Sequence, residues 1–203
     1  MNYLKQCFNF GDKPLSRAWV LFVQCVREQK NSQQAEGLMQ QYTNELTSSV
    51  IASFDAPRYT DQQLSEMNVE ARNLIIEQQE YARHHPITAI YRAAVAGSLT
   101  LRGGVVDEPN PDPSQGMKVQ LDNGQWVSMV TEGATVTYPD GTKATIITSA
   151  GQLSEWEGKG IALVGSLLDN GDQILSTPDY RLMFSFREGE SMPDDFLTVA
   201  KVA

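Results

Sequence analysis

The sequence predicts an α+β protein, with a helical N-terminal region, residues 1–90, followed by an all-β region, residues 91–203. In the first region apolar residues recur every three or four positions, which is the spacing of an amphipathic helix. In the second, short alternating apolar runs are separated by glycine-containing turns, which is typical of strands joined as hairpins. A six-residue pattern also recurs within the β region, which indicates internal repeats.

The N-terminal region contains three apolar stripes, so we expect about three helices. Asp12 precedes the first as an N-cap, and that helix ends near Asn31. Thr60 and Gln63 form a capping-box pattern that begins the third helix. Pro86 ends it, because proline disfavours helical backbone at the residue before it. The stripes are Leu15, Ala18, Trp19, Phe22, Cys25 and Val26; Leu38, Met39, Tyr42, Leu46, Val50 and Phe54; and Leu64, Met67, Ala71, Leu74, Ile75 and Tyr81.

The recurring pattern appears three times, with central residues Gly97, Thr131 and Gly165 spaced 34 residues apart. A fixed period of this size means that each copy is one supersecondary unit, which buries its apolar face by stacking on its neighbours. Three units therefore predict a single body with pseudo-threefold symmetry. The Asp-Gly and Asn-Gly turns at Gly141 and Gly171 tolerate positive φ and fold short strands back on one another.

Three pieces of the β region resemble the PAAR-repeat family, whose members cap the spike of bacterial type VI secretion systems. They are AGSLTLRGGVV at residues 96–106, QWVSMVTEGATV at 125–136, and GIALVGSLL at 160–168 followed by ILST at 174–177. They are similar in order and spacing to the family's opening, middle and closing motifs, and together they span less than half of the chain. The resemblance implies a PAAR-like β-cone of short hairpins, and the alternating residues 180–186 predict one further strand beyond it.

In that family a zinc ion near the apex of the cone is held by three histidines and one cysteine. The corresponding positions here are Arg102, Tyr138, Asp140 and Asn170. A guanidinium cannot ligate a metal, and a tyrosine with an asparagine is not a zinc pair. The resemblance therefore implies a degenerate apex with no metal and no cofactor.

A structural zinc supplies about 10–16 kcal/mol in small domains, and a fully buried apolar side chain contributes about 1.5–3 kcal/mol. Four to six additional apolar residues would therefore replace the ion. The alternative is that such residues are ordinary core and the tip is less stable. The candidates are Leu101, Met117, Trp126, Tyr138, Trp156 and Leu168.

Composition excludes several classes of function. The net charge of −9 disfavours nucleic-acid binding, which needs a clustered positive surface. No apolar run of membrane-spanning length and no secretory leader is evident, so we expect no stable membrane insertion.

Cys7 and Cys25 are expected to be reduced. His84 and His85, the only histidines, are adjacent, so no dispersed histidine serves a nucleophile and we expect no enzymatic activity. Residues 107–113 alternate proline with polar residues, which favours an exposed extended loop over a calcium site.

These observations and the resemblance together predict a structural spike-tip protein of a type VI secretion system. It would cap a trimeric VgrG-type spike, one chain per trimer, and leave the bacterial cytoplasm through the secretion machine. Val130 and Val164 are the candidate contact residues, unless they belong to the core. The helical region either packs against the cone or recruits an effector or a chaperone. The alternatives are a secreted effector whose N-terminal helical region is toxic, and a phage-like baseplate spike tip.

Overall fold

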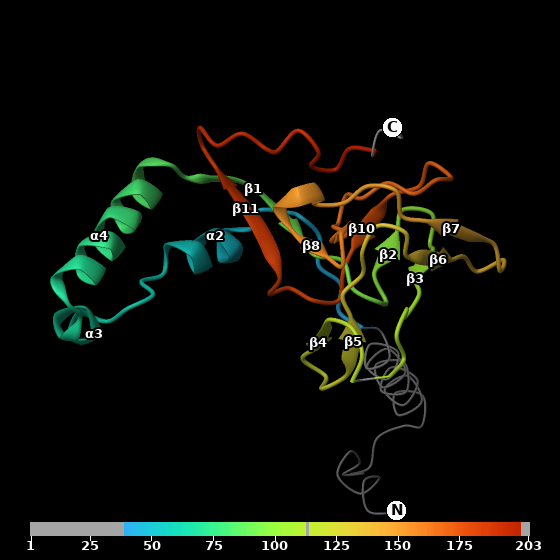
Figure 1. Ribbon diagram of the computed structural model, residues 1–203, viewed down its shortest axis with the longest axis horizontal. Helices are drawn as coiled ribbons and strands as arrows, with labels where there is room; N and C mark the ends of the chain where they lie inside the picture. The colour runs from blue at the N-terminus through green and yellow to red at the C-terminus, as the bar shows by residue number, and fades with distance from the viewer. Residues whose placement is uncertain (1–38, 113, 200–203) are drawn as a thin grey trace, which may run out of the picture. The chain divides into compact units, whose positions relative to one another are not determined.

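The structure is a computed structural model of the chain and describes residues 39–112 and 114–199 (Figure 1). The chain separates into two compact units between Gln40 and Gln41. The helices from residue 48 onward fall in the same unit as the strands. The boundary near residue 90 stays a prediction of the sequence. The helix predicted over residues 12–31 and both cysteines lie outside the described residues.

Within the described residues, three helices precede the strands: α2 (Ser48–Asp55), α3 (Asp61–Glu66) and α4 (Val69–His84). The predicted capping box is confirmed, since the side chains and backbone N–H groups of Thr60 and Gln63 bond reciprocally. The stop before Pro86 is also confirmed, with His85 as the C-cap of α4. Two helix predictions are wrong in part. Residues 39–47 are not helical, because Tyr42 pairs with Thr177, and Asn68 starts a new helix within the third stripe.

The remaining elements are short antiparallel strands in small sheets, so the chain is α+β with mostly β content (Figure 1). One sheet has the order β10-β2-β3-β6-β7, and three two-stranded ribbons are formed by β1 with β11, β4 with β5, and β8 with β9. The further strand predicted over residues 180–186 is confirmed as β11. The bounds are β1 (Ile87–Arg92), β2 (Leu99–Thr100), β3 (Val105–Val106), β4 (Lys118–Gln120), β5 (Trp126–Ser128), β6 (Thr135–Thr137), β7 (Lys143–Thr145), β8 (Glu155–Trp156), β9 (Lys159–Gly160), β10 (Ile174–Ser176) and β11 (Met183–Arg187), with a 3-10 turn at Gly151–Leu153.

Three backbone segments form a closed ring of hydrogen bonds at the centre of the strands. The N–H of Ala94 donates to the carbonyl of Ala162 at 2.8 Å, Ala162 donates to Val130 at 2.9 Å, and Val130 donates back to Ala94 at 3.2 Å. Ala94, Val130 and Ala162 are the ring centres, and a second set of bonds lies two residues away from them. The N–H of Ala96 donates to the carbonyl of Ser128, that of Glu132 to Gly160, and that of Val164 to Arg92. The three segments are therefore related by a pseudo-threefold axis.

The equivalent glycines are Gly97, Gly133 and Gly165, each three residues beyond its ring centre. Their φ angles are 86°, 87° and 102°, a backbone region that glycine adopts without strain. The expectation that Thr131 is the middle equivalent is wrong by two residues. The outer glycines are 68 residues apart, so equal spacing put the middle copy at the midpoint, whereas the connecting hairpins differ in length.

Each unit has the same parts on either side of its ring segment. A ribbon leads into the segment, and a hairpin follows it. The ribbons join the ring through equivalent bonds: Ala93 N–H to Leu182, Met129 N–H to Met117, and Ile161 N–H to Ser154, at 2.9, 2.8 and 2.9 Å. The hairpins are β2–β3, β6–β7 and residues 166–174, and each turns on a glycine of positive φ, namely Gly103, Gly141 and Gly171.

The main core lies among the ring and the three hairpins. Its buried residues are Ala94, Val106, Val130, Val136, Ala144, Ile146, Ala162, Val164, Leu168 and Ile174. A second cluster packs Leu163 of the ring against Phe186 of β11 and Phe196, whose rings meet edge to face at 5.2 Å. The β1–β11 ribbon is thus packed onto the ring by apolar and aromatic contacts.

Candidate functional site

The tips of the three hairpins meet in one polar cluster. The hydroxyl of Tyr138, from the second hairpin, donates to Oδ2 of Asp172 in the third at 2.6 Å. Nδ2 of Asn170 donates to the Tyr138 hydroxyl at 3.0 Å, and Nη1 of Arg102, from the first hairpin, donates to the Asn170 carbonyl at 3.3 Å. The structure therefore brings together three of the four predicted apex positions. Asp140 stays apart and accepts from Thr142 in its own turn.

Asp172 was missed by the sequence reasoning, although it is the most buried member of the cluster at 2% exposure. Burial raises the pKa of its carboxyl. Hydrogen bonds from the hydroxyls of Thr100 and Tyr138 and from the backbone N–H groups of Gln173 and Arg102 outweigh that effect and hold the pKa below its ordinary value. Burial and the bond to Asp172 raise the pKa of Tyr138, which keeps the phenol protonated as a donor.

The residues at this tip do not fit a zinc ion. The cluster offers one carboxylate, a phenol and an amide, which are already bonded to one another, and it contains no imidazole or thiolate. Within residues 39–112 and 114–199 no group of three histidine, cysteine, aspartate or glutamate side chains is placed to hold a metal.

The expectation that apolar side chains take over from the ion is wrong for three of its candidates. Leu101, Trp126 and Trp156 are 59%, 53% and 43% exposed. Leu168 is buried in the core and Tyr138 packs partly against it. Polar contacts among the hairpin tips therefore accompany the apolar packing of Leu168 and Tyr138.

The two predicted contact residues are not on the surface. Val130 and Val164 are 1% and 4% exposed and belong to the main core, so the alternative interpretation of both as core residues is the one the structure favours. The ribbons repeat in backbone position, although only Trp156 and Lys159 among the residues at the matching positions are exposed. Phe184, Val119 and Trp156 occupy equivalent positions on β11, β4 and β8, opposite Tyr91, Val127 and Lys159.

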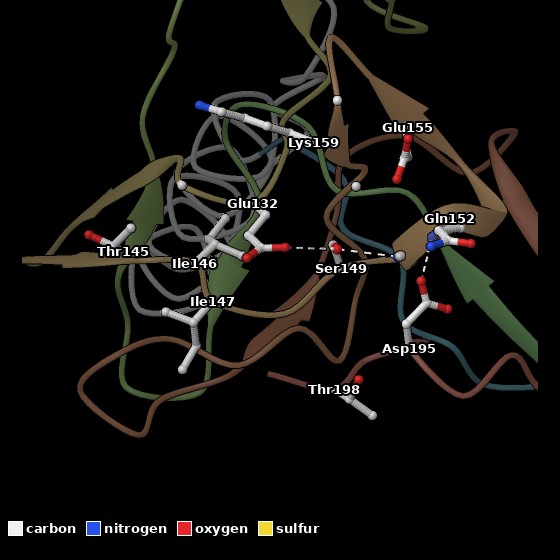
Figure 2. Close-up of a pocket in the computed structure, with 14 residues that line it drawn as sticks. Glu132, Thr145, Ile146, Ile147, Ser149, Gln152, Glu155, Lys159, Asp195 and Thr198 are labelled. Atoms are coloured by element: carbon white, nitrogen blue, oxygen red, sulfur yellow. Dashed lines mark hydrogen bonds between the residues drawn. The ribbon is translucent and has the colours of Figure 1, made fainter. Parts of the chain in front are cut away.

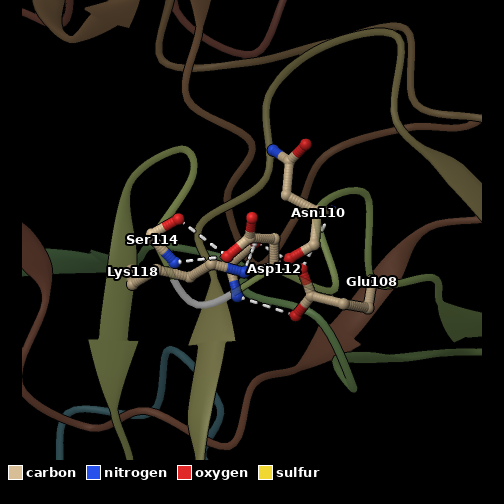
Figure 3. Close-up of polar contacts among 6 residues, drawn as sticks. Glu108, Asn110, Asp112, Ser114 and Lys118 are labelled. Atoms are coloured by element: carbon tan, nitrogen blue, oxygen red, sulfur yellow. Dashed lines mark hydrogen bonds and ion pairs between the residues drawn. The ribbon is translucent and has the colours of Figure 1, made fainter.

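The proline-rich loop is exposed at Glu108, Pro109, Pro111 and Asp112, as the sequence predicted, and a buried lysine anchors it (Figure 3). The side chain of Lys118 is 8% exposed, and its Nζ lies 3.2 Å from Oε1 of Glu108 and 2.8 Å from Oγ of Ser128. It also contacts the carbonyl of Asn110. The second carboxylate oxygen of Glu108 accepts from the N–H of Ser128 at 2.9 Å. The ammonium group thus takes the carboxylate, carbonyl and hydroxyl oxygens that a calcium ion at this loop would need.

A shallow hollow of about 550 Å³ lies beside the second ring segment and the β8–β9 ribbon (Figure 2). Ser149 donates to Glu132 at 3.2 Å, and Asp195 accepts from the backbone N–H of Gln152 at 2.7 Å. The described residues that line this hollow include no histidine. His84 and His85 lie at the end of α4, where the His85 ring stacks on Tyr81 at 4.0 Å between centroids.

The helices α2, α3 and α4 contain no buried residue. None of the helices in the described part of the chain is both long enough and apolar enough to span a bilayer. Neither a known family model nor a curated protein nor a solved structure matches this chain.

Proposed function

We propose that this chain is a spike-tip protein that caps a trimeric VgrG-type spike of a type VI secretion system. The observation that supports the proposal is the closed ring of backbone hydrogen bonds, with one ribbon and one hairpin for each of its three segments. A homotrimer presents three identical ends about its axis. A single chain satisfies all three only if it offers three quasi-equivalent surfaces.

The ribbons are the surfaces that suit this role. Their pairing with the ring is equivalent in backbone register, whereas the side chains at matching positions differ in size and charge. A partner with exact threefold symmetry is therefore recognised mainly through features that the three ribbons share. Each ribbon has two strands within the described residues, which leaves strand edges available for pairing with the partner.

The action of such a protein is mechanical. The hairpins close the tip through short turns and cross-hairpin hydrogen bonds, and the force for puncture comes from the contracting machine. The chain would be made in the bacterial cytoplasm and exported in the folded state together with the spike. No catalytic step is required of any residue.

The test is the mass of the complex with a trimeric spike protein encoded near this chain, measured by light scattering. One chain per trimer is expected. Trp156→Glu, on the β8 ribbon, should weaken binding at least tenfold, whereas Leu101→Glu, on the first hairpin and more exposed, should not. A complex of three chains per trimer, no complex with any such spike, or equal effects of the two substitutions would overturn the proposal.

A second role is favoured by the helices. Val69, Leu74 and Tyr81 of α4 are 64%, 56% and 46% exposed, so α4 presents apolar side chains to solvent. We propose that it recruits an effector or a chaperone. The other candidates are a toxic helical region and a phage-like baseplate tip, which an encoded immunity protein or phage sheath genes nearby would distinguish.

A further inference from the structure

The buried carboxylate at the hairpin tips is unusual because it has no cationic partner. Taking a charge out of water is costly unless hydrogen bonds or an opposite charge compensate. In the part of the chain that the structure describes, no lysine, arginine or histidine forms an ion pair with Asp172. Arg102, on the first hairpin, donates to the backbone carbonyl of Asn170 instead.

Contacts from all three hairpins surround the charge. The second hairpin supplies the Tyr138 hydroxyl, at 2.6 Å from Oδ2. The first hairpin is bound to the third by the Leu101 N–H, which donates to the Gln173 carbonyl at 3.0 Å, and its Thr100 hydroxyl and Arg102 N–H help to lower the pKa of the carboxyl. The third supplies the N–H of Gln173, at 2.8 Å from Oδ1. Two of these donors are polarised further, because Thr100 Oγ1 accepts from the N–H of Gly104 at 2.8 Å and the Tyr138 hydroxyl accepts from Asn170.

We propose that the Asp172 carboxylate is the ion that holds the three hairpin tips together. In a metal site, ligands from several segments converge on a cation; here, hydrogen-bond donors converge on an anion that belongs to the chain. The groups around Asp172 are donors, whereas a metal site needs acceptors, so the two arrangements exclude each other. The proposal does not depend on the partner that the chain binds.

The test compares Asp172→Asn with Asp140→Asn in the full chain. Both remove one negative charge from a hairpin tip, but Asp140 is exposed and its contacts stay within its own turn. The amide at position 172 would turn an N–H toward donors and leave them unpaired. The melting temperature should fall by about 5–10 °C for Asp172→Asn and by less than about 2 °C for Asp140→Asn.

Amide hydrogen exchange shows whether Asp172 stabilises the neighbouring hairpins or only its own turn. Asp172→Asn should speed exchange of the Arg102 and Gly104 amides in the first hairpin by at least tenfold. Tyr138→Phe keeps the ring and removes one donor, so it remains informative if the first variant does not fold. It should lower the melting temperature by about 2–5 °C, and by much less when added to Asp172→Asn.

Three results would overturn the proposal. These are equal melting temperatures for the two aspartate variants, additive effects of Asp172→Asn and Tyr138→Phe, and a loss of stability of the unmodified protein in a metal chelator. Melting that is unchanged by chelator, together with accelerated exchange in the first hairpin, would support it.

Discussion

Replacing Lys118 by methionine should destabilise the protein far more than the same change at Lys143. The two lysines pair with neighbouring carboxylates of one loop. Lys118 lies 3.2 Å from Glu108 with an 8% exposed side chain, whereas Lys143 lies 3.6 Å from Asp107 with a 64% exposed side chain. The two substitutions therefore remove the same side chain beside the same loop, and they differ in how deeply the lysine is buried.

The magnitude follows from what each substitution leaves behind. Removing one partner of a buried ion pair costs about 3–5 kcal/mol. Because the Glu108 side chain is 30% exposed and regains water, we expect about 2 kcal/mol for Lys118→Met. An exposed pair contributes about 0–1 kcal/mol, so Lys143→Met should cost less than about 1 kcal/mol. For a chain of this size, 2 kcal/mol corresponds to about 4–8 °C in melting temperature.

The assay is equilibrium unfolding in denaturant, monitored by tryptophan fluorescence and repeated between pH 3 and 7. Burial raises the pKa of Glu108, but hydrogen bonds from Ser128, Asn110 and Lys118 hold it below its ordinary value. A lowered folded pKa adds stability that is present above the unfolded pKa, about 4.3, and lost as the pH falls through the folded value. The unmodified protein should therefore lose this contribution below about pH 4.3. Equal unfolding free energies for the two lysine variants at pH 7 would refute the reasoning.

Two further predictions concern the ring and the connection to it. Gly133→Ala should lower the free energy of unfolding by about 1–2 kcal/mol, because the φ of 87° at this position strains any residue with a side chain. Thr131→Ala should lower it by less than about 1 kcal/mol. The reverse order of the two effects in thermal unfolding would restore Thr131 as the middle equivalent. Limited trypsin digestion should cut at exposed Arg58 and Arg83 and spare Arg92, which is 4% exposed and paired in β1. A fragment of residues 86–203 should then unfold cooperatively and one of residues 93–203 should aggregate, because the latter lacks the strand that covers Phe186; soluble, folded 93–203 would contradict this.

The sequence by itself determined the class of fold and the local signals. Helix starts and stops depend on residues close in the chain, which is why the capping box at Thr60 and the stop before Pro86 were predicted correctly. Turn glycines such as Gly141 and Gly171 were also visible, because positive φ is a property of one residue. The threefold repeat was visible in the outer copies.

Only the tertiary structure decided which residues meet. The register of the middle copy depends on the ring of hydrogen bonds, since Val130 pairs with Ala94 and Ala162 across more than 30 residues of chain each way. Residues 39–47 have a helical pattern, but the N–H and carbonyl of Tyr42 pair with Thr177 instead. Tertiary pairing overrides a pattern of modest helix propensity.

The candidate site shows the same division. The sequence located the hairpin tips and three of the residues in them, because motif spacing marks turns. It did not show that Asp172 is buried or that Tyr138 points at it, since both depend on how three separate hairpins converge. Likewise, the loop at residues 107–113 was located by its prolines, but a lysine brought in by a neighbouring strand holds it. Burial and long-range pairing are properties of the assembled chain. They decided that the carboxyl of Asp172 and the ammonium group of Lys118 are buried.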